Sequence, residues 1–185
     1  ILEVMGRYAG WIALNAAIAG GAEICLLPEF PYDINKVLDN VNQRFERNRG
    51  FVNIVISESA RAIGKDYTTL SEKEIGNEHR RLGGVANVLM HELKEAGCEH
   101  SIRTTVLGHL QRGGIPIAYD RILATQFGVK AFEMVLNNEF GKMVSYRHPN
   151  IVSVSLEEVL KQPKLVEADA SLMNTARGVG IHFGD

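Results

Sequence analysis

Short apolar runs alternate with longer helix-like segments along most of this chain, and this alternation constrains its fold more than any other feature. The runs are 4 to 8 residues long, and the third is enriched in β-branched residues. Such runs, bounded by Gly and Pro, predict strands. The predicted strands are residues 1–4, 24–29, 51–58 and 102–109.

The segments between the runs carry helix start and stop signals. Asp33 is positioned to cap one helix, and the pair Gly20–Gly21 to end another. Ser71 and Glu74 have the spacing of a capping box, which predicts a further short helix. The longer predicted helices are residues 10–21, 33–50, 84–97 and 119–138. Strands that alternate with helices in this way predict an α/β fold of three layers with a mainly parallel sheet.

Composition excludes several classes of function. The chain has 185 residues, enough for one domain or one large lobe, and its net charge of -2 provides no polybasic surface for nucleic acid. No apolar run reaches the roughly 18 residues that a membrane span needs. Cys25 and Cys98 lack CxxC spacing, so we expect packed, reduced thiols and a cytoplasmic protein.

Polar residues that follow the strands are the first candidates for a site, because ligands of α/β sheets bind at the carboxyl ends of the strands. Met5, Gly6 and Arg7 follow the first run. Gly6 allows a close backbone approach, and the next helix offers N–H groups to an anion. The alternative is a plain turn with a surface arginine. Glu58, after the third run, either accepts hydrogen bonds from sugar hydroxyls or caps a turn.

The fourth run carries three basic side chains in and just after it: Arg103, His109 and Arg112. A guanidinium group presents a planar fork of donors that fits phosphate oxygens, and a histidine with two arginines forms a cradle for an anion. In the alternative, Arg112 pairs with Glu29 or Asp120 and His109 is a core histidine. Three such groups around one strand and its exit favour anion binding.

Familiar catalytic signatures are missing from the sequence. There is no Walker A loop and no GxGxxG motif, and the other histidines lack the paired spacing of a metal site. The sequence motifs therefore leave the strand-end groups as the candidates.

Four segments together closely resemble the 6-phosphofructokinases, in order and in spacing. They read "EVMGRYAGW", "AIAGGAEICLLPE", "VISE" and "RTTVLGHLQRGGIPIAYDRILAT". The resemblance implies a Rossmann-like phosphofructokinase lobe. Family members are about twice this length, so the chain is similar to their C-terminal half. On this resemblance residues 1–114 form the sugar-phosphate-binding lobe, and residues 115–185 supply a return helix and a C-terminal segment that complete the two lobes.

The resemblance also implies roles for individual residues. The segment matching Met5, Gly6 and Arg7 contacts fructose 6-phosphate, and the glutamate matching Glu58 binds sugar hydroxyls. In the family, a loop after the fourth strand holds the 6-phosphate through a histidine and an arginine, and two further residues lie between them in that loop. In this sequence the loop is His109, Leu110, Gln111 and Arg112.

Two further roles concern assembly and regulation. The arginine that matches Arg103 reaches into the sugar site of a neighbouring subunit, which implies a homo-oligomer, either a dimer or a tetramer. Glu23 matches a residue that helps to bind the allosteric effector in some bacterial members.

The implied reaction is phosphoryl transfer to the 1-hydroxyl of fructose 6-phosphate, which gives fructose 1,6-bisphosphate in glycolysis. The catalytic aspartate, the donor loop and the Mg²⁺ ligands belong to the missing N-terminal half. We therefore expect this piece alone to be inactive, and the donor stays open between ATP and pyrophosphate. We also expect the helix from Tyr119 to pack against absent residues and to expose its apolar face. The alternatives are a regulatory module that binds sugar phosphate without catalysis, and a domain whose arginines only stabilise an oligomer.

Overall fold

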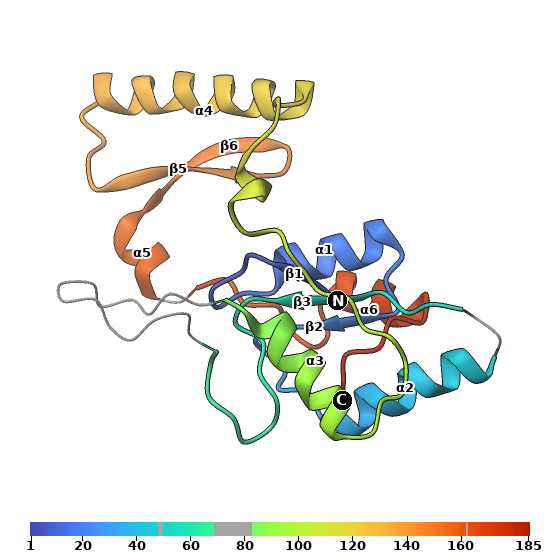
Figure 1. Ribbon diagram of the computed structural model, residues 1–185. Helices are drawn as coiled ribbons and strands as arrows, with labels where there is room; N and C mark the ends of the chain where they lie inside the picture. Colours follow the sequence, from blue (N-terminus) through green and yellow to red (C-terminus); the bar gives the residue numbers. More distant parts are fainter. Residues whose placement is uncertain (48–49, 69–82, 162) are drawn as a thin grey trace. The chain divides into compact units, whose positions relative to one another are not determined.

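The computed structural model describes residues 1–47, 50–68, 83–161 and 163–185. The chain forms two compact units (Figure 1). One unit is Ile1–Gln111 together with Leu165–Asp185, and the other is Arg112–Lys164. The short helix predicted at Ser71 and Glu74 lies outside the described residues.

The first unit contains a parallel sheet of four strands in the order β2-β3-β1-β4. Each strand lies within one of the four apolar runs, which confirms the predicted α/β fold. Because every pair is parallel, the carboxyl ends of all four strands meet at one edge. The strands are β1 (Leu2–Val4), β2 (Ile24–Leu26), β3 (Ile54–Ser57) and β4 (Thr105–Val106).

Helices cover both faces of this sheet and give three layers (Figure 1). One core cluster joins alternate strand residues such as Ile24 and Ile56 to α2 and α3. The other joins the residues between them, such as Cys25 and Val55, to α1 and α6. Burial on both faces explains why β2 and most of β3 are continuously apolar instead of alternating with polar residues, whereas both residues of β4 are exposed. The helices are α1 (Trp11–Gly20), α2 (Ile34–Glu46), α3 (Val85–Glu95) and α6 (Ser171–Gly178).

The helix boundaries follow the predicted signals in two places. The carboxylate of Asp33 accepts the N–H of Asn35 at 2.9 Å and caps α2. Gly21 ends α1 in the left-handed region, with a φ of 65° that a residue with a Cβ adopts only at a cost. α2 ends at Glu46, short of the predicted stop at Gly50, and residues 48–49 are outside the described part.

Both cysteines are buried free thiols, which confirms the prediction that they are packed. Burial, together with the nearby Glu29 carboxylate, raises the pKa of the Cys25 thiol to about 12. Because the thiolate is the nucleophilic form, Cys25 is unreactive near neutral pH.

The second unit pairs one long helix with a hairpin. α4 (Ala118–Leu136) packs on the antiparallel strands β5 (Lys142–Arg147) and β6 (Asn150–Ser155), and α5 (Leu156–Lys161) follows. None of the helices among the described residues is long and apolar enough to cross a membrane.

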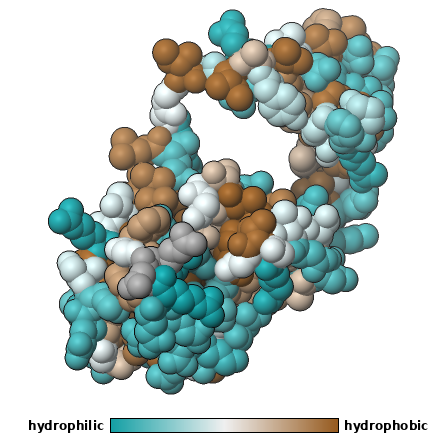
Figure 2. Space-filling model, turned by 90° about the vertical axis from the view of Figure 1, so that its right-hand side faces the viewer, coloured by the Kyte–Doolittle hydropathy of each residue, from teal (hydrophilic) through white to brown (hydrophobic). Residues whose placement is uncertain are grey.

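Much of the apolar surface of α4 is exposed within its own unit. Ile122, Phe132 and Val135 have exposed fractions of 59%, 64% and 57%. These residues belong to the apolar face that the sequence predicts to be exposed in this chain, and Met134 alone among the residues of the helix is buried. Hydrophobic side chains do appear at the molecular surface in Figure 2.

Candidate functional site

The carboxyl edge of the sheet brings together segments that lie far apart in the sequence. β1 pairs with β3 on one side and with β4 on the other, with Val4 opposite Ser57 and Glu3 opposite Val106. Met5–Gly6–Arg7, Glu58 and the 3₁₀ helix η1 (Gly108–Arg112) therefore leave the sheet at one edge.

Hydrogen bonds join these three segments. The N–H of Gly6 donates to Oε1 of Glu58 at 3.2 Å, and the N–H of Met5 donates to Oε1 of Gln111 at 2.6 Å. Behind them, the N–H of Glu58 donates to the carbonyl of Val4 at 2.9 Å, which continues the pairing of β1 with β3. Met5, Gly6, Glu58 and Gln111 thus form one bonded cluster.

Gly6 is the most tightly held residue of this cluster. Its carbonyl accepts hydrogen bonds from Ser57 Oγ at 2.7 Å and from Ser59 Oγ at 2.5 Å. Its φ is 153°, and a Cβ at this position would lie 2.7 Å from Ser57 Oγ and 2.9 Å from the carbonyl of Ala9. The glycine is thus required by the packing of the chain itself. Sequence reasoning missed both serines, although they flank Glu58 in "SES".

His109 and Leu110 lie on the surface, on η1, and Leu110 is 77% exposed. His109 is therefore not a core histidine, and the alternative interpretation of this residue is wrong. Arg7 is also exposed, and its guanidinium carbon lies 5.9 Å from the centre of the Tyr8 ring.

Arg112 ends η1, is exposed, and takes part in no salt bridge between described residues. Both carboxylates considered as its partners have other hydrogen bonds. Glu29 accepts the N–H groups of Gly10 and Val166, each at 2.9 Å. Asp120 accepts the N–H of Ile117 at 3.1 Å, at the start of α4.

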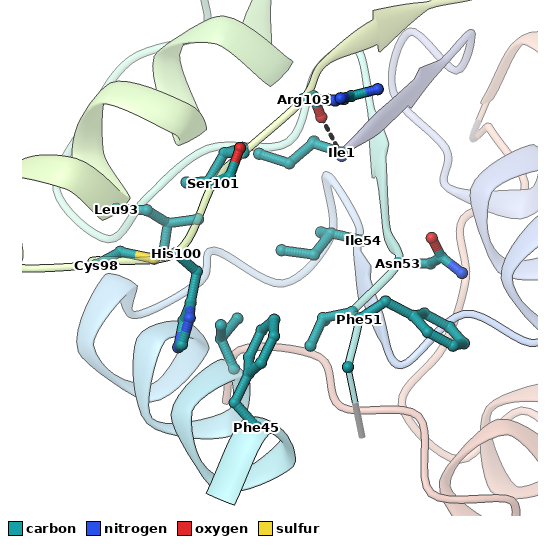
Figure 3. Close-up of a pocket in the computed structure, with 14 residues that line it drawn as sticks. Ile1, Phe45, Phe51, Asn53, Ile54, Leu93, Cys98, His100, Ser101 and Arg103 are labelled. Carbon is teal, nitrogen blue, oxygen red and sulfur yellow. Dashed lines mark hydrogen bonds between the residues drawn. The ribbon is translucent and has the colours of Figure 1, made fainter. Parts of the chain in front are cut away.

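Arg103 lies at the opposite edge of the sheet from His109. Its carbonyl accepts a hydrogen bond from the amino group of Ile1 at 2.7 Å, at the amino ends of β1 and β4 (Figure 3). The three basic groups of the fourth run therefore do not gather at one end of the strand. Arg103 is separated from the cluster at the carboxyl edge by the length of β4.

The amino edge has a cavity of its own, of about 420 Å³. Figure 3 shows its lining side chains, which come from Ile1, α2, residues 50–54, α3 and the segment that leads into β4. Phe45 and His100 stack there with ring centres 3.7 Å apart. Sequence reasoning missed this cavity because its residues are spread over five separate segments of the chain.

Glu23, the suggested effector contact, is engaged within the chain. Its carboxylate forms a salt bridge with Arg44 at 2.5 Å and accepts the N–H of Asn53 at 2.6 Å. A ligand at this position would meet Glu23 and Arg44 as a pair. Among the described residues, no His, Cys, Asp and Glu side chains gather in a group that could hold a metal ion.

The fold and the cluster define an α/β protein whose candidate ligand site lies at the carboxyl edge of a parallel sheet. The sequence model of the phosphofructokinase family matches residues 1–135. The chain belongs to the phosphofructokinase family.

Individual relatives include users of both phosphoryl donors. The chain is 46% identical to an ATP-dependent 6-phosphofructokinase 2 of Clostridium perfringens, over 100% of this chain and 50% of that protein. It is 43% identical to a pyrophosphate–fructose 6-phosphate 1-phosphotransferase of Amycolatopsis methanolica, over 90% of this chain and 48% of that protein. This chain therefore spans about half the length of these curated relatives.

A solved structure gives the same answer for the fold. The crystal structure of a pyrophosphate-dependent phosphofructokinase from Marinobacter aquaeolei superposes with a TM-score of 0.72 at 28% identity. The match covers 97% of this chain and 46% of the other.

Proposed function

We propose that this chain is the sugar-phosphate-binding half of a 6-phosphofructokinase. The whole protein would transfer a phosphoryl group to the 1-hydroxyl of fructose 6-phosphate and give fructose 1,6-bisphosphate, a step of glycolysis. The observation that carries the proposal is the bonded cluster of Met5, Gly6, Glu58 and Gln111 at the carboxyl edge, in a chain of this family. The reduced, buried thiols support a cytoplasmic location.

Glu58 is suited to hold sugar hydroxyl groups. An ionised carboxylate has about four acceptor sites, and the N–H of Gly6 uses one of them. The remaining sites accept hydroxyl donors from the sugar, while Arg7 and the backbone of Met5 and Gly6 line the same turn.

His109 and Arg112 are suited to hold the 6-phosphate. Both are exposed side chains of η1, and a guanidinium group binds phosphate oxygens through two parallel hydrogen bonds. Leu110 and Gln111 lie between them, and Gln111 links η1 to the Met5 backbone. Binding of the phosphate at η1 would thus be coupled to the turn that meets the sugar.

The chemical step requires groups from the half that this chain does not span. We propose that an aspartate there takes the proton of the sugar 1-hydroxyl as the oxygen bonds to the donor's terminal phosphorus and the bond to the leaving group breaks. Residues there would also hold Mg²⁺ and the donor, ATP or pyrophosphate. Relatives of both kinds are similarly identical to this chain, at 46% and 43%.

The missing half also provides a partner for α4. Its exposed residues, including Ile122 and Phe132, form an apolar surface that water solvates poorly. We propose that residues 1–114 act as the sugar-phosphate lobe, while residues 115–185 complete the two lobes by packing in part against the missing half. The compact units divide the chain after Gln111 and return Leu165–Asp185 to the sheet.

Arg103 is proposed to serve a neighbouring subunit of a homo-oligomer. Its place at the amino edge keeps it from the cluster of its own chain, and its side chain is exposed. Glu23, paired with Arg44 near the same edge, is proposed as an effector contact.

An activity assay tests the proposed function. The protein from the complete reading frame is incubated with fructose 6-phosphate, Mg²⁺ and either ATP or pyrophosphate, and the bisphosphate product is measured. We expect turnover with one of the two donors, and none above background for the 185-residue chain alone. Phosphoryl transfer depends on the metal and on positioned donor groups, which this chain does not supply.

The alternative function gives a different result. A regulatory module would bind fructose 6-phosphate in a titration and show no turnover with either donor. Turnover by the 185-residue chain alone would contradict the assignment of catalysis to the missing half.

A further inference from the structure

We propose that Ser57 and Ser59 are positioning residues for the sugar phosphate: together they fix the peptide groups of Gly6, so that the Met5–Gly6–Arg7 turn and the Glu58 carboxylate form one rigid binding element. This proposal rests on the proposed function, because it takes fructose 6-phosphate as the ligand of the Met5–Gly6–Arg7 turn.

The two serine hydroxyls converge on a single carbonyl oxygen. Ser57 Oγ lies 2.7 Å and Ser59 Oγ 2.5 Å from the oxygen of Gly6, and both serines are 0% exposed. A carbonyl oxygen has two lone pairs, and here each accepts from a buried hydroxyl. Both hydrogen bonds are partly buried, and hydrogen bonds that are shielded from water are stronger than exposed ones and costly to break, so the orientation of this carbonyl is well fixed.

Glu58, between the two serines, holds the other side of Gly6. Its carboxylate accepts the N–H of Gly6 at 3.2 Å. Three consecutive residues therefore bind both the N–H and the carbonyl of one glycine, across 51 to 53 positions of sequence. One hydrogen-bond donor is enough to satisfy a buried carbonyl oxygen. The hydroxyl of the second serine therefore serves to fix the orientation of the Gly6 carbonyl.

The backbone of Gly6 makes this fixation necessary. Its φ of 153° lies in a region that side chains rarely adopt, and glycine by itself has many other conformations open to it. Without the two hydroxyls the turn would sample several of them, and Arg7 and the Glu58 carboxylate would move with it. Ordering such a turn when the ligand binds costs free energy, and a turn that is already ordered avoids this cost.

The test uses the protein from the complete reading frame with Ser57→Ala, Ser59→Ala and both together. We expect the KM for fructose 6-phosphate to rise roughly threefold for each single change and about tenfold for the double variant. The kcat and the KM for the phosphoryl donor should stay within about twofold, because the lost contribution is to sugar binding alone. Ser101→Ala, an exposed serine at the amino edge, is the matched control and should leave all values unchanged.

Several outcomes decide the proposal. A lower melting temperature with an unchanged KM means a purely structural role and overturns it, as does an equal rise in the KM of the donor. If the alanine variants fail to fold, Ser59→Cys keeps the size with a weaker donor, and its KM must rise for the proposal to stand. If the wild-type protein neither binds nor turns over fructose 6-phosphate, the proposed function fails, and this inference fails with it. If the wild-type protein is active and the serine variants have the same KM as the wild type, this inference alone fails.

Discussion

Replacement of Arg112 by alanine is expected to weaken the binding of fructose 6-phosphate by roughly thirtyfold or more, since loss of a charged donor from a phosphate site costs about 2 kcal/mol. Arg112 has no salt bridge with a described carboxylate, so its guanidinium group has little competing interaction to lose on binding. Calorimetric titration of the protein from the complete reading frame measures the effect.

The matched control for this variant is Arg47→Ala. Arg47 is exposed at the end of α2, and its removal changes the net charge by the same amount. It should leave the dissociation constant unchanged, which separates a local contact from the general field of the protein. A dissociation constant for Arg112→Ala within twofold of wild type would remove Arg112 from the site.

Replacement of Glu3 by alanine is expected to lower the free energy of unfolding by about 3 kcal/mol, because it breaks two charge-assisted hydrogen bonds inside the protein. Glu3 is 2% exposed although it lies within β1. Its carboxylate accepts the N–H groups of Gly84 and Ala86, both at 2.9 Å, at the N-terminus of α3. These N–H groups have no partner within the helix, and the helix dipole favours a negative charge there.

Urea denaturation of the protein from the complete reading frame measures this loss of stability. Glu3→Gln keeps one acceptor oxygen and should lose less stability than Glu3→Ala, while Glu46→Ala, at an exposed position of α2, should be nearly neutral. If Glu3→Ala shifts the urea midpoint no more than Glu46→Ala does, the carboxylate does not hold α3 to the sheet.

The sheet and its helices were predictable because their signals are local. A run such as residues 51–58 contains both the β-branched residues and the continuous apolar character of a strand covered on both faces. Asp33 and Gly21 mark helix ends by their own chemistry, and the structure confirms both. The parallel order then places residues after β1, β3 and β4 at one edge.

The contacts that build the site were not predictable, because they join distant residues. The N–H of Met5 and the side-chain oxygen of Gln111 that accepts it are 106 positions apart, and no local pattern indicates their pairing. The position of Arg103, by contrast, could have been predicted from the length of the strand. An extended segment advances about 3.3 Å per residue, so the step from Arg103 to His109 covers roughly 20 Å and reaches opposite edges of the sheet.

The apolar face of α4 illustrates a further limit. The sequence correctly predicts a helix with an apolar surface, and the helix forms at Ala118–Leu136. The sequence of the helix does not identify the partner of that surface, and Phe132 is 64% exposed in this chain. The chain spans about half the length of its curated relatives, and we propose that the partner lies in the half that it does not span.

The most direct test of the account is a crystal structure of the protein from the complete reading frame with fructose 6-phosphate bound. We expect the 6-phosphate to lie within hydrogen-bonding distance of the His109 and Arg112 side chains, with a sugar hydroxyl on the Glu58 carboxylate. A sugar phosphate bound elsewhere, with the Gly6 turn and η1 making no contact to it, would contradict the account.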